Sequence, residues 1–284
     1  MRTCRKYYGL TLLLFVFLLP GCSSDDDGND NNNGEITEVD ATTYDLAEVN
    51  GSGVFGTARI ADMSDGSVTI SLDLEGTPSG GEHPAHIHFN TAAEGGGIAL
   101  TLGTVDGSSG ESTINVTEFD DGSAVTYQDL LDYNGYINVH LSANELETIV
   151  AQGDIGQNDL TGTVKTYPLS EQAVAGISGT IEFAERENGT ALATIALTGT
   201  PEGGSHPAHI HENDVATGGG IIFTFNPVSG DTGISRTQVA EFDNGDPLTY
   251  ADILEVNGYV NVHLSAEDLG TLVAQGNIGS NEGN

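Results

Sequence analysis

The sequence predicts an all-β protein of two tandem domains, each a Greek-key β-sandwich or flattened barrel with at most one short helix. Three observations predict it. The chain of 284 residues is long enough for two cores, and it is rich in glycine, poor in aromatic residues and free of tryptophan. Short runs of Val, Ile and Thr alternate with Gly, Asn, Asp and Pro, as is typical of strands and turns. The second half also repeats the first.

The repeat has a constant offset. His206 follows His83 by 123 residues, and no gap is needed to align Tyr44–Gly156 with the second copy. A period this long indicates duplicated domains rather than a solenoid. We therefore expect one domain at residues 41–158 and another at 164–280, joined by a short polar linker.

Each copy contains six runs with strand character and one helix signal. The Ser142-Ala-Asn-Glu145 pattern resembles a capping box and predicts a short helix through Val150, and Ser265–Asp268 stands at the same place in the second copy. Tyr127 and Tyr250 are expected to pack in loops. The strands expected in the first copy are Val54–Ile60, Ser67–Leu74, His86–Phe89, Ile98–Leu102, Ser112–Thr117 and Tyr136–Leu141.

The N-terminus predicts export from the cytoplasm. Residues 1–21 combine basic residues with the apolar run Leu10–Leu19, which is a secretory signal too short to span a membrane. The following Cys22 resembles the lipidated cysteine of bacterial lipoproteins, and an ordinary cleaved signal is the alternative. Residues 22–40 are expected to form an acidic flexible tether. We expect a lipid-anchored protein of the bacterial cell envelope, on the outer membrane or cell surface.

The charge of the chain excludes several partners. The two cysteines are Cys4 and Cys22, so no disulfide is expected in the mature chain. The formal net charge is −35. Such a surface repels nucleic acid and anionic lipid headgroups, so no nucleic acid is expected and membrane contact is expected only through the N-terminal lipid. The basic residues beyond the signal are Arg59, Lys165, Arg186 and Arg236.

All eight histidines belong to the repeated pattern. Strand alternation places His86 and His88 on one face, and His140 on the face opposite an apolar stripe, so neighbouring strands bring three imidazoles within reach of one cation. Three or four imidazoles without thiolate or carboxylate suit copper or zinc better than nickel or iron, with up to one ion per domain. His83 precedes a proline and is either a fourth ligand or a support for the ligands. The second copy carries His209, His211 and His263, with His206 in the place of His83. The alternative is that the histidines only pack or cap loops.

These motifs resemble two related families. His83–His88, Asn138–His140 and Ala151–Gly156 are similar to the copper half of Cu/Zn superoxide dismutases, while the tandem layout is closer to chordin-type (CHRD) domains. The first resemblance implies that His86, His88 and His140 bind copper and that His83 is structural. It implies the same roles for His209, His211, His263 and His206.

Departures from the dismutases weigh against efficient catalysis. Asn90–Gly97 holds no histidine for a zinc site, and neither Leu141–Gln152 nor Leu264–Gln275 supplies the family's active-site arginine. A strongly acidic protein also lacks the cationic steering that attracts superoxide. The leading hypothesis is a CHRD-like copper-binding protein without efficient catalysis. The alternatives are a superoxide dismutase-like copper enzyme and a metal-free adhesion module, and no protein partner is identified.

Overall fold

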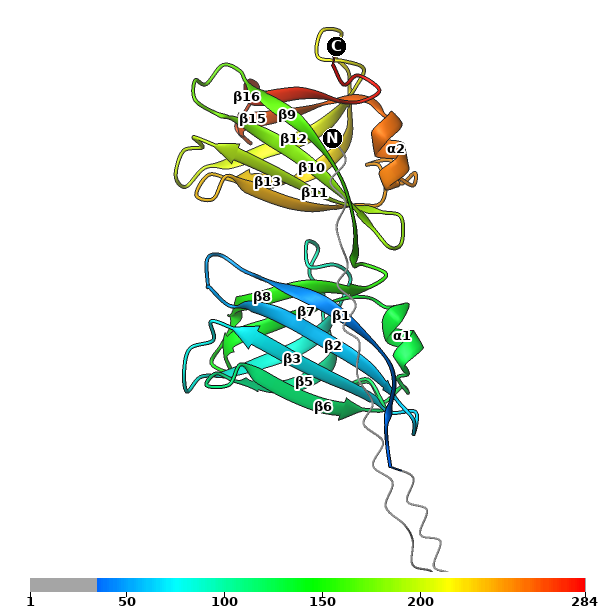
Figure 1. Ribbon diagram of the computed structural model, residues 1–284. Coiled ribbons are helices and arrows are strands. Elements are labelled where there is room, and N and C mark those ends of the chain that lie inside the picture. The colour runs from blue at the N-terminus through cyan, green and yellow to red at the C-terminus, as the bar shows by residue number, and fades with distance from the viewer. Residues whose placement is uncertain (1–34, 284) are drawn as a thin grey trace, which may run out of the picture. The chain divides into compact units, whose positions relative to one another are not determined.

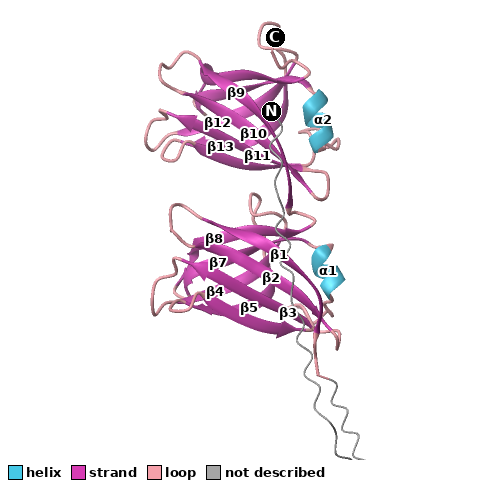
Figure 2. Cartoon of the chain, in the orientation of Figure 1, coloured by secondary structure: helices cyan, strands magenta, loops and turns pink. Residues whose placement is uncertain are grey.

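The computed structural model describes residues 35–283, so the expected signal, Cys22 and most of the expected tether lie outside the described residues (Figure 1). The described chain forms two eight-stranded antiparallel sheets and two short helices (Figure 2). Among these residues, no helix has the length and apolar character needed to cross a membrane. The all-β class with one short helix beside each sheet is confirmed.

The first sheet, called repeat 1, has the strand order β5-β4-β7-β8-β1-β2-β3-β6. β1 joins its two halves, because its first residues pair with β2 while Ala47 and Glu48 pair with β8. Neighbours such as β3 and β6 are far apart in sequence, which gives the predicted Greek-key pattern. The elements are β1 (Glu38–Glu48), β2 (Phe55–Met63), β3 (Val68–Glu75), β4 (Glu82–Phe89), β5 (Ile98–Asp106), β6 (Glu111–Val116), α1 (Tyr127–Leu131), β7 (Asn134–Ser142) and β8 (Glu145–Gly156).

The second sheet, called repeat 2, has the equivalent order β13-β12-β15-β16-β9-β10-β11-β14. Its edge strands are bridged by Asn226, whose backbone N–H donates to Thr237 Oγ1 at 2.9 Å and whose carbonyl accepts from Ser235 Oγ at 2.6 Å. The sheet is therefore nearly closed. The elements are β9 (Leu160–Glu171), β10 (Ser178–Arg186), β11 (Ala191–Thr198), β12 (Ser205–Glu212), β13 (Ile221–Ser229), β14 (Ile234–Val239), α2 (Tyr250–Glu255), β15 (Asn257–Ser265) and β16 (Asp268–Gly279).

Each repeat encloses its own apolar core. In repeat 1 the alternating residues of β3 point inward and meet Ala85 and Ile87 of β4 and Ile137 and Val139 of β7, all of them fully or almost fully buried. Burial of each larger side chain contributes about 1.5–3 kcal/mol. The core thus fixes the inner faces of β4 and β7, and it leaves their alternate residues on the other face.

The predicted helix after Ser142 is wrong. β7 and β8 form a hairpin there, and in repeat 2 the Ser265 hydroxyl accepts backbone N–H groups of Glu267 and Asp268, so this pattern closes a turn instead. The helices begin at Tyr127 and Tyr250, which were expected in loops. Each follows a Thr-x-x-Asp capping box: Thr126 with Asp129, and Thr249 with Asp252.

Two strands of each sheet have no counterpart among the predicted runs. β1 begins at Glu38, inside the range expected as tether, and β8 begins at Glu145. The residues of both strands are mainly exposed at their N-terminal ends, so apolar alternation is weak there. Their positions are set by pairing rather than by a local pattern.

Candidate metal centre

The histidines of repeat 1 meet on the side of β4 and β7 that faces away from the core. The two strands are adjacent and antiparallel, with His86 opposite Asn138 and His88 opposite Tyr136. His140 lies further along β7, next to shifts in the register with β8, and its ring centroid lies 5.1 Å from that of His86. One ring nitrogen from each of the three histidines lies within 4.8 Å of the other two.

Backbone carbonyls select which nitrogens face the centre. His88 Nδ1 lies 3.0 Å from Gly96 O, and His140 Nδ1 lies 2.6 Å from Leu146 O. Because a carbonyl only accepts, each Nδ1 carries the proton and each Nε2 keeps a lone pair. His86 faces the other two histidines with its Nδ1, which lies 3.1 Å from His140 Nε2. The set is one Nδ1 and two Nε2 atoms.

Repeat 2 reproduces this arrangement. His211 Nδ1 lies 3.0 Å from Gly219 O, and His263 Nδ1 lies 2.7 Å from Leu269 O. The remaining atoms, His209 Nδ1, His211 Nε2 and His263 Nε2, are buried and have no hydrogen-bond partner among the described residues. Buried polar atoms are normally satisfied, so three unpartnered nitrogens at one point require an explanation. A bound cation supplies one.

Burial favours the neutral, metal-binding form of two histidines in each group, His86 and His140 in repeat 1 and His209 and His263 in repeat 2. His86, His88 and His140 are 9%, 8% and 5% exposed. Desolvation is the main cause that lowers the pKa of His86 and His140, and repulsion between the neighbouring imidazolium forms lowers the pKa further. The pKa values of His209 and His263 are lowered for the same reasons. The histidines were expected on the outer face of the strands, and they are buried there, in contact with the backbone carbonyls of Gly96 and Leu146.

A tyrosine supports the covering loop in each repeat, a role that the sequence patterns did not indicate. The Tyr136 ring stacks on His88 with centroids 5.0 Å apart and an interplanar angle of 19°. Its hydroxyl accepts the backbone N–H of Gly96 at 3.0 Å, and the carbonyl of Gly96 accepts from His88. Tyr259 repeats both contacts with His211 and Gly219. The one sequence signal for this role was the even spacing of Tyr136 from His140, which places both side chains on the same face of the strand.

His83 and His206 lie outside the two groups of candidate ligands. Alternation turns His83 toward the side of Ala85 and Ile87, away from His86 and His88. Its Nδ1 lies 3.2 Å from the carbonyl oxygen of His140, so it contacts the backbone of a ligand residue rather than the centre. His206 holds the carbonyl of His263 at the same distance. Each of these two histidines thus contacts the backbone of a candidate ligand residue.

The chemistry of the donor atoms narrows the choice of metal ion. Each group consists of three imidazoles, with no carboxylate or thiolate. The negative charge of Asp120 acts to raise the pKa of His86, but both oxygens of Asp120 already accept hydrogen bonds from Thr101, at 3.0 and 2.7 Å. Imidazole nitrogens suit copper and zinc better than calcium or magnesium. Three protein donors also leave coordination positions open.

Comparison with known proteins connects the chain to the Cu/Zn superoxide dismutases over a limited segment. A stretch of 60 residues is 43% identical to the cell surface superoxide dismutase [Cu-Zn] 4 of Candida albicans, covering 20% of this chain and 26% of that protein. The chain thus spans about a quarter of the length of this relative. No protein-family model matches the sequence.

Two solved structures of Candida albicans superoxide dismutase 5, a mutant and a Cu(II) form, resemble part of the chain. The TM-scores are 0.29 and 0.28, and the sequence identities are 19% and 18%. Each match covers 41% of this chain and 90% of the other.

Proposed function

We propose that this chain is an extracytoplasmic, lipid-anchored protein of the bacterial envelope that binds copper, one ion in each histidine group. In this proposal residues 41–158 and 164–280 are two CHRD-like domains behind a signal, a lipidated Cys22 and a tether. His86, His88 and His140 are the ligands in the first domain. The observation that carries the proposal is the convergence of three buried, unpartnered nitrogens at the equivalent point of the second domain, at His209, His211 and His263.

Two further observations favour preformed sites over chance clusters. The Nδ1 protons of two ligands in each group are fixed by backbone carbonyls, which is the usual way in which a protein orients a metal-binding imidazole. The geometry also recurs: the centroid distance between His86 and His140 is 5.1 Å, and the distance between His209 and His263 is 5.1 Å. Zinc fits the same donors and is the competing ion.

Calorimetric titration of the full chain with Cu(II) and, separately, with Zn(II) tests the proposal. We expect two sites for copper, one site after His86→Ala or His209→Ala, and no high-affinity site after both. Metal at about a hundred times its dissociation constant should stabilise the folded chain by about 2.7 kcal/mol. Thermal unfolding unaffected by copper and by chelator would instead support a metal-free structural or adhesion module.

A superoxide dismutase-like redox enzyme is the second candidate, favoured by the 60-residue similarity to a Cu/Zn enzyme and by the open coordination positions. The acidic charge and the lack of Arg or Lys in Leu141–Gln152 oppose rapid capture of an anion. Pulse radiolysis of the copper-loaded chain distinguishes the two. If superoxide decays no faster than with an equal amount of free copper chelate, the chain binds copper without dismutase activity. Much faster decay that disappears in His86→Ala/His209→Ala would establish the enzyme.

A further inference from the structure

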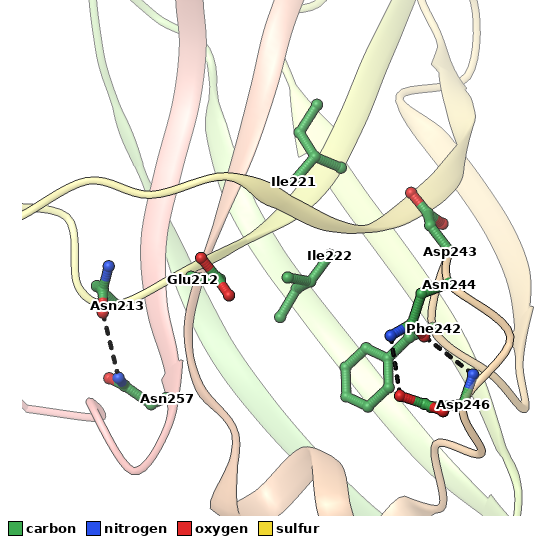
Figure 3. A pocket seen from close by; sticks show the side chains of 9 residues that line it. All are labelled: Glu212, Asn213, Ile221, Ile222, Phe242, Asp243, Asn244, Asp246 and Asn257. Carbon is green, nitrogen blue, oxygen red and sulfur yellow. Dashed lines mark hydrogen bonds between the residues drawn. The ribbon is translucent and has the colours of Figure 1, made fainter.

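A hollow of about 710 Å³ opens on repeat 2 beside, but outside, the histidine group. It lies where β12 ends and β13 begins, next to the loop that precedes α2 (Figure 3). Ile222 and Phe242 form an apolar floor, and Glu212, Asp243 and Asp246 supply carboxylates around it. The volume is in the range of sites for small organic ligands.

Repeat 1 carries aromatic rings at the positions that border this hollow. Tyr133 stacks on Phe119, with centroids 5.5 Å apart, and its ring lies 6.2 Å from that of Phe89. The equivalents of these three residues, at the offset of 123, are Val256, Phe242 and Glu212. Val256 has no ring to place over Phe242, and Glu212 replaces an apolar ring with a charge. Two substitutions thus exchange an aromatic cluster for a hollow.

The electrostatics of the hollow favour a cation. None of its nine lining residues is basic. Asp243 accepts hydrogen bonds from Thr224, and Asp246 accepts one from Asn244, so neither carboxyl group is paired with a cationic side chain in these contacts. The Glu212 side chain is exposed and makes no hydrogen bond or ion pair with any described residue. A free carboxylate beside an apolar floor is complementary to a cationic head on an apolar stem.

We propose that this hollow binds a small organic cation, namely an alkylammonium or guanidinium group on a short apolar stem. The stem lies on Ile222 and Phe242, and the head pairs with Glu212. Phe242 adds attraction of its ring face for the cation. The site belongs to repeat 2 alone, and it uses no histidine, so it stands whether or not the chain binds copper.

Titration of the ¹⁵N-labelled full chain with n-butylammonium, followed by amide chemical shifts, tests the proposal. Saturable shifts are expected at Ile222 and Asp243 and not at their repeat-1 equivalents, Ala99 and Asp120. The neutral analogue n-butanol should bind about threefold more weakly or worse, and added salt should reduce this difference.

Matched variants locate the interaction. Glu212→Gln keeps the shape of the rim and should weaken butylammonium binding about two- to fivefold. Glu202→Gln removes the same charge from another exposed site of repeat 2 and should change nothing. Val256→Tyr should abolish binding by restoring the missing ring. The reverse pair in repeat 1, Phe89→Glu with Tyr133→Val, should create binding there.

A second titration distinguishes between a cation that belongs to a protein segment and one that is a free amine. Nα-acetyl-lysinamide presents the same ammonium as a protein side chain, so binding equal to that of butylammonium indicates a protein segment, whereas exclusion of this probe indicates a free amine. The proposal is overturned if butanol binds as tightly as butylammonium, or if the shifts appear equally in both repeats. It is also overturned if Glu212→Gln, which alters only an exposed side chain, leaves the affinity unchanged.

Discussion

Removal of the charge of Asp154 should destabilise the fold more than removal of its partner Arg186. Arg186 lies at the end of β10 with its side chain fully buried, and its Nη1 donates to Asp154 Oδ2 at 2.7 Å. The guanidinium also donates to Gln238 Oε1 and to the carbonyl of Asn158, which are neutral acceptors. Asp154 is thus the charge that compensates the buried cation, although its own side chain is 11% exposed.

The expected loss of stability depends on which groups each variant leaves without a hydrogen-bond or charge partner. The other oxygen of Asp154 accepts the backbone N–H of Ala92 at 2.8 Å. Asp154→Asn can keep that bond, as Asn277 does with Val215 in repeat 2, but its amide then turns N–H groups toward Arg186. A buried charge left without its partner costs about 3 kcal/mol or more. Arg186→Met, which installs the residue found at the equivalent Met63, leaves a partly exposed carboxylate and should cost about 1 kcal/mol.

Urea unfolding followed by far-ultraviolet circular dichroism measures these costs in a double-mutant cycle. The midpoint of Asp154→Asn should fall by about 1 to 1.5 M, given typical slopes. In the Arg186→Met background the same change should have almost no effect on stability, because there is no buried cation to lose its charge partner. Equal costs of Asp154→Asn in the two backgrounds would refute the reasoning.

Three further outcomes are expected. Thr126→Ala should lower the free energy of unfolding by about 1 kcal/mol, since the capping hydroxyl of α1 is lost. Hydrogen bonds from the Thr126 hydroxyl and backbone N–H lower the pKa of Asp129. The part of the hydroxyl's contribution that is made with the carboxylate is therefore present above the unfolded pKa of about 4 and is lost as the pH falls through the folded value, whereas the cap bond from the Asp129 N–H remains. The difference in unfolding free energy between wild type and Thr126→Ala should narrow in acid, and a constant difference down to pH 2 would contradict this. Tyr136→Phe should weaken copper binding at the first proposed site about three- to tenfold in calorimetry, because the loop that orients His88 loses its anchor on Gly96; unchanged affinity would assign the tyrosine to packing alone.

The candidate ligands could be predicted because they depend on a short-range rule. Alternation along β4 and β7 puts His86 and His88 on one face and the core residue Ile87 on the other, and the structure shows this arrangement. The same rule places His83 on the opposite side. Their burial could not be predicted in this way, because the covering carbonyl of Gly96 comes from a loop whose conformation depends on Tyr136, about 40 residues later.

The errors arose where one local pattern suits two structures. The Ser-x-x-acid spacing at Ser142 is compatible with a helix start and with a hairpin turn, and the pairing of β7 with β8 decides between them. The Thr-x-x-Asp spacing at Thr126 does begin a helix, since no partner strand competes for that backbone. The hollow of repeat 2 could not be predicted either, because its lining residues come from the end of β12, the start of β13 and the loop before α2, which only the fold brings together.

The pairing of β1 with β8 has a kinetic consequence. Ala47 pairs with Gln152, roughly a hundred residues later, so the sheet of repeat 1 closes only after most of its chain is in place. Long-range antiparallel pairing of this kind slows folding, because the entropy of loop closure is lost before contacts compensate for it. During synthesis, His86 and His88 leave the ribosome before His140, so the candidate ligand set is incomplete until β7 has paired with β4.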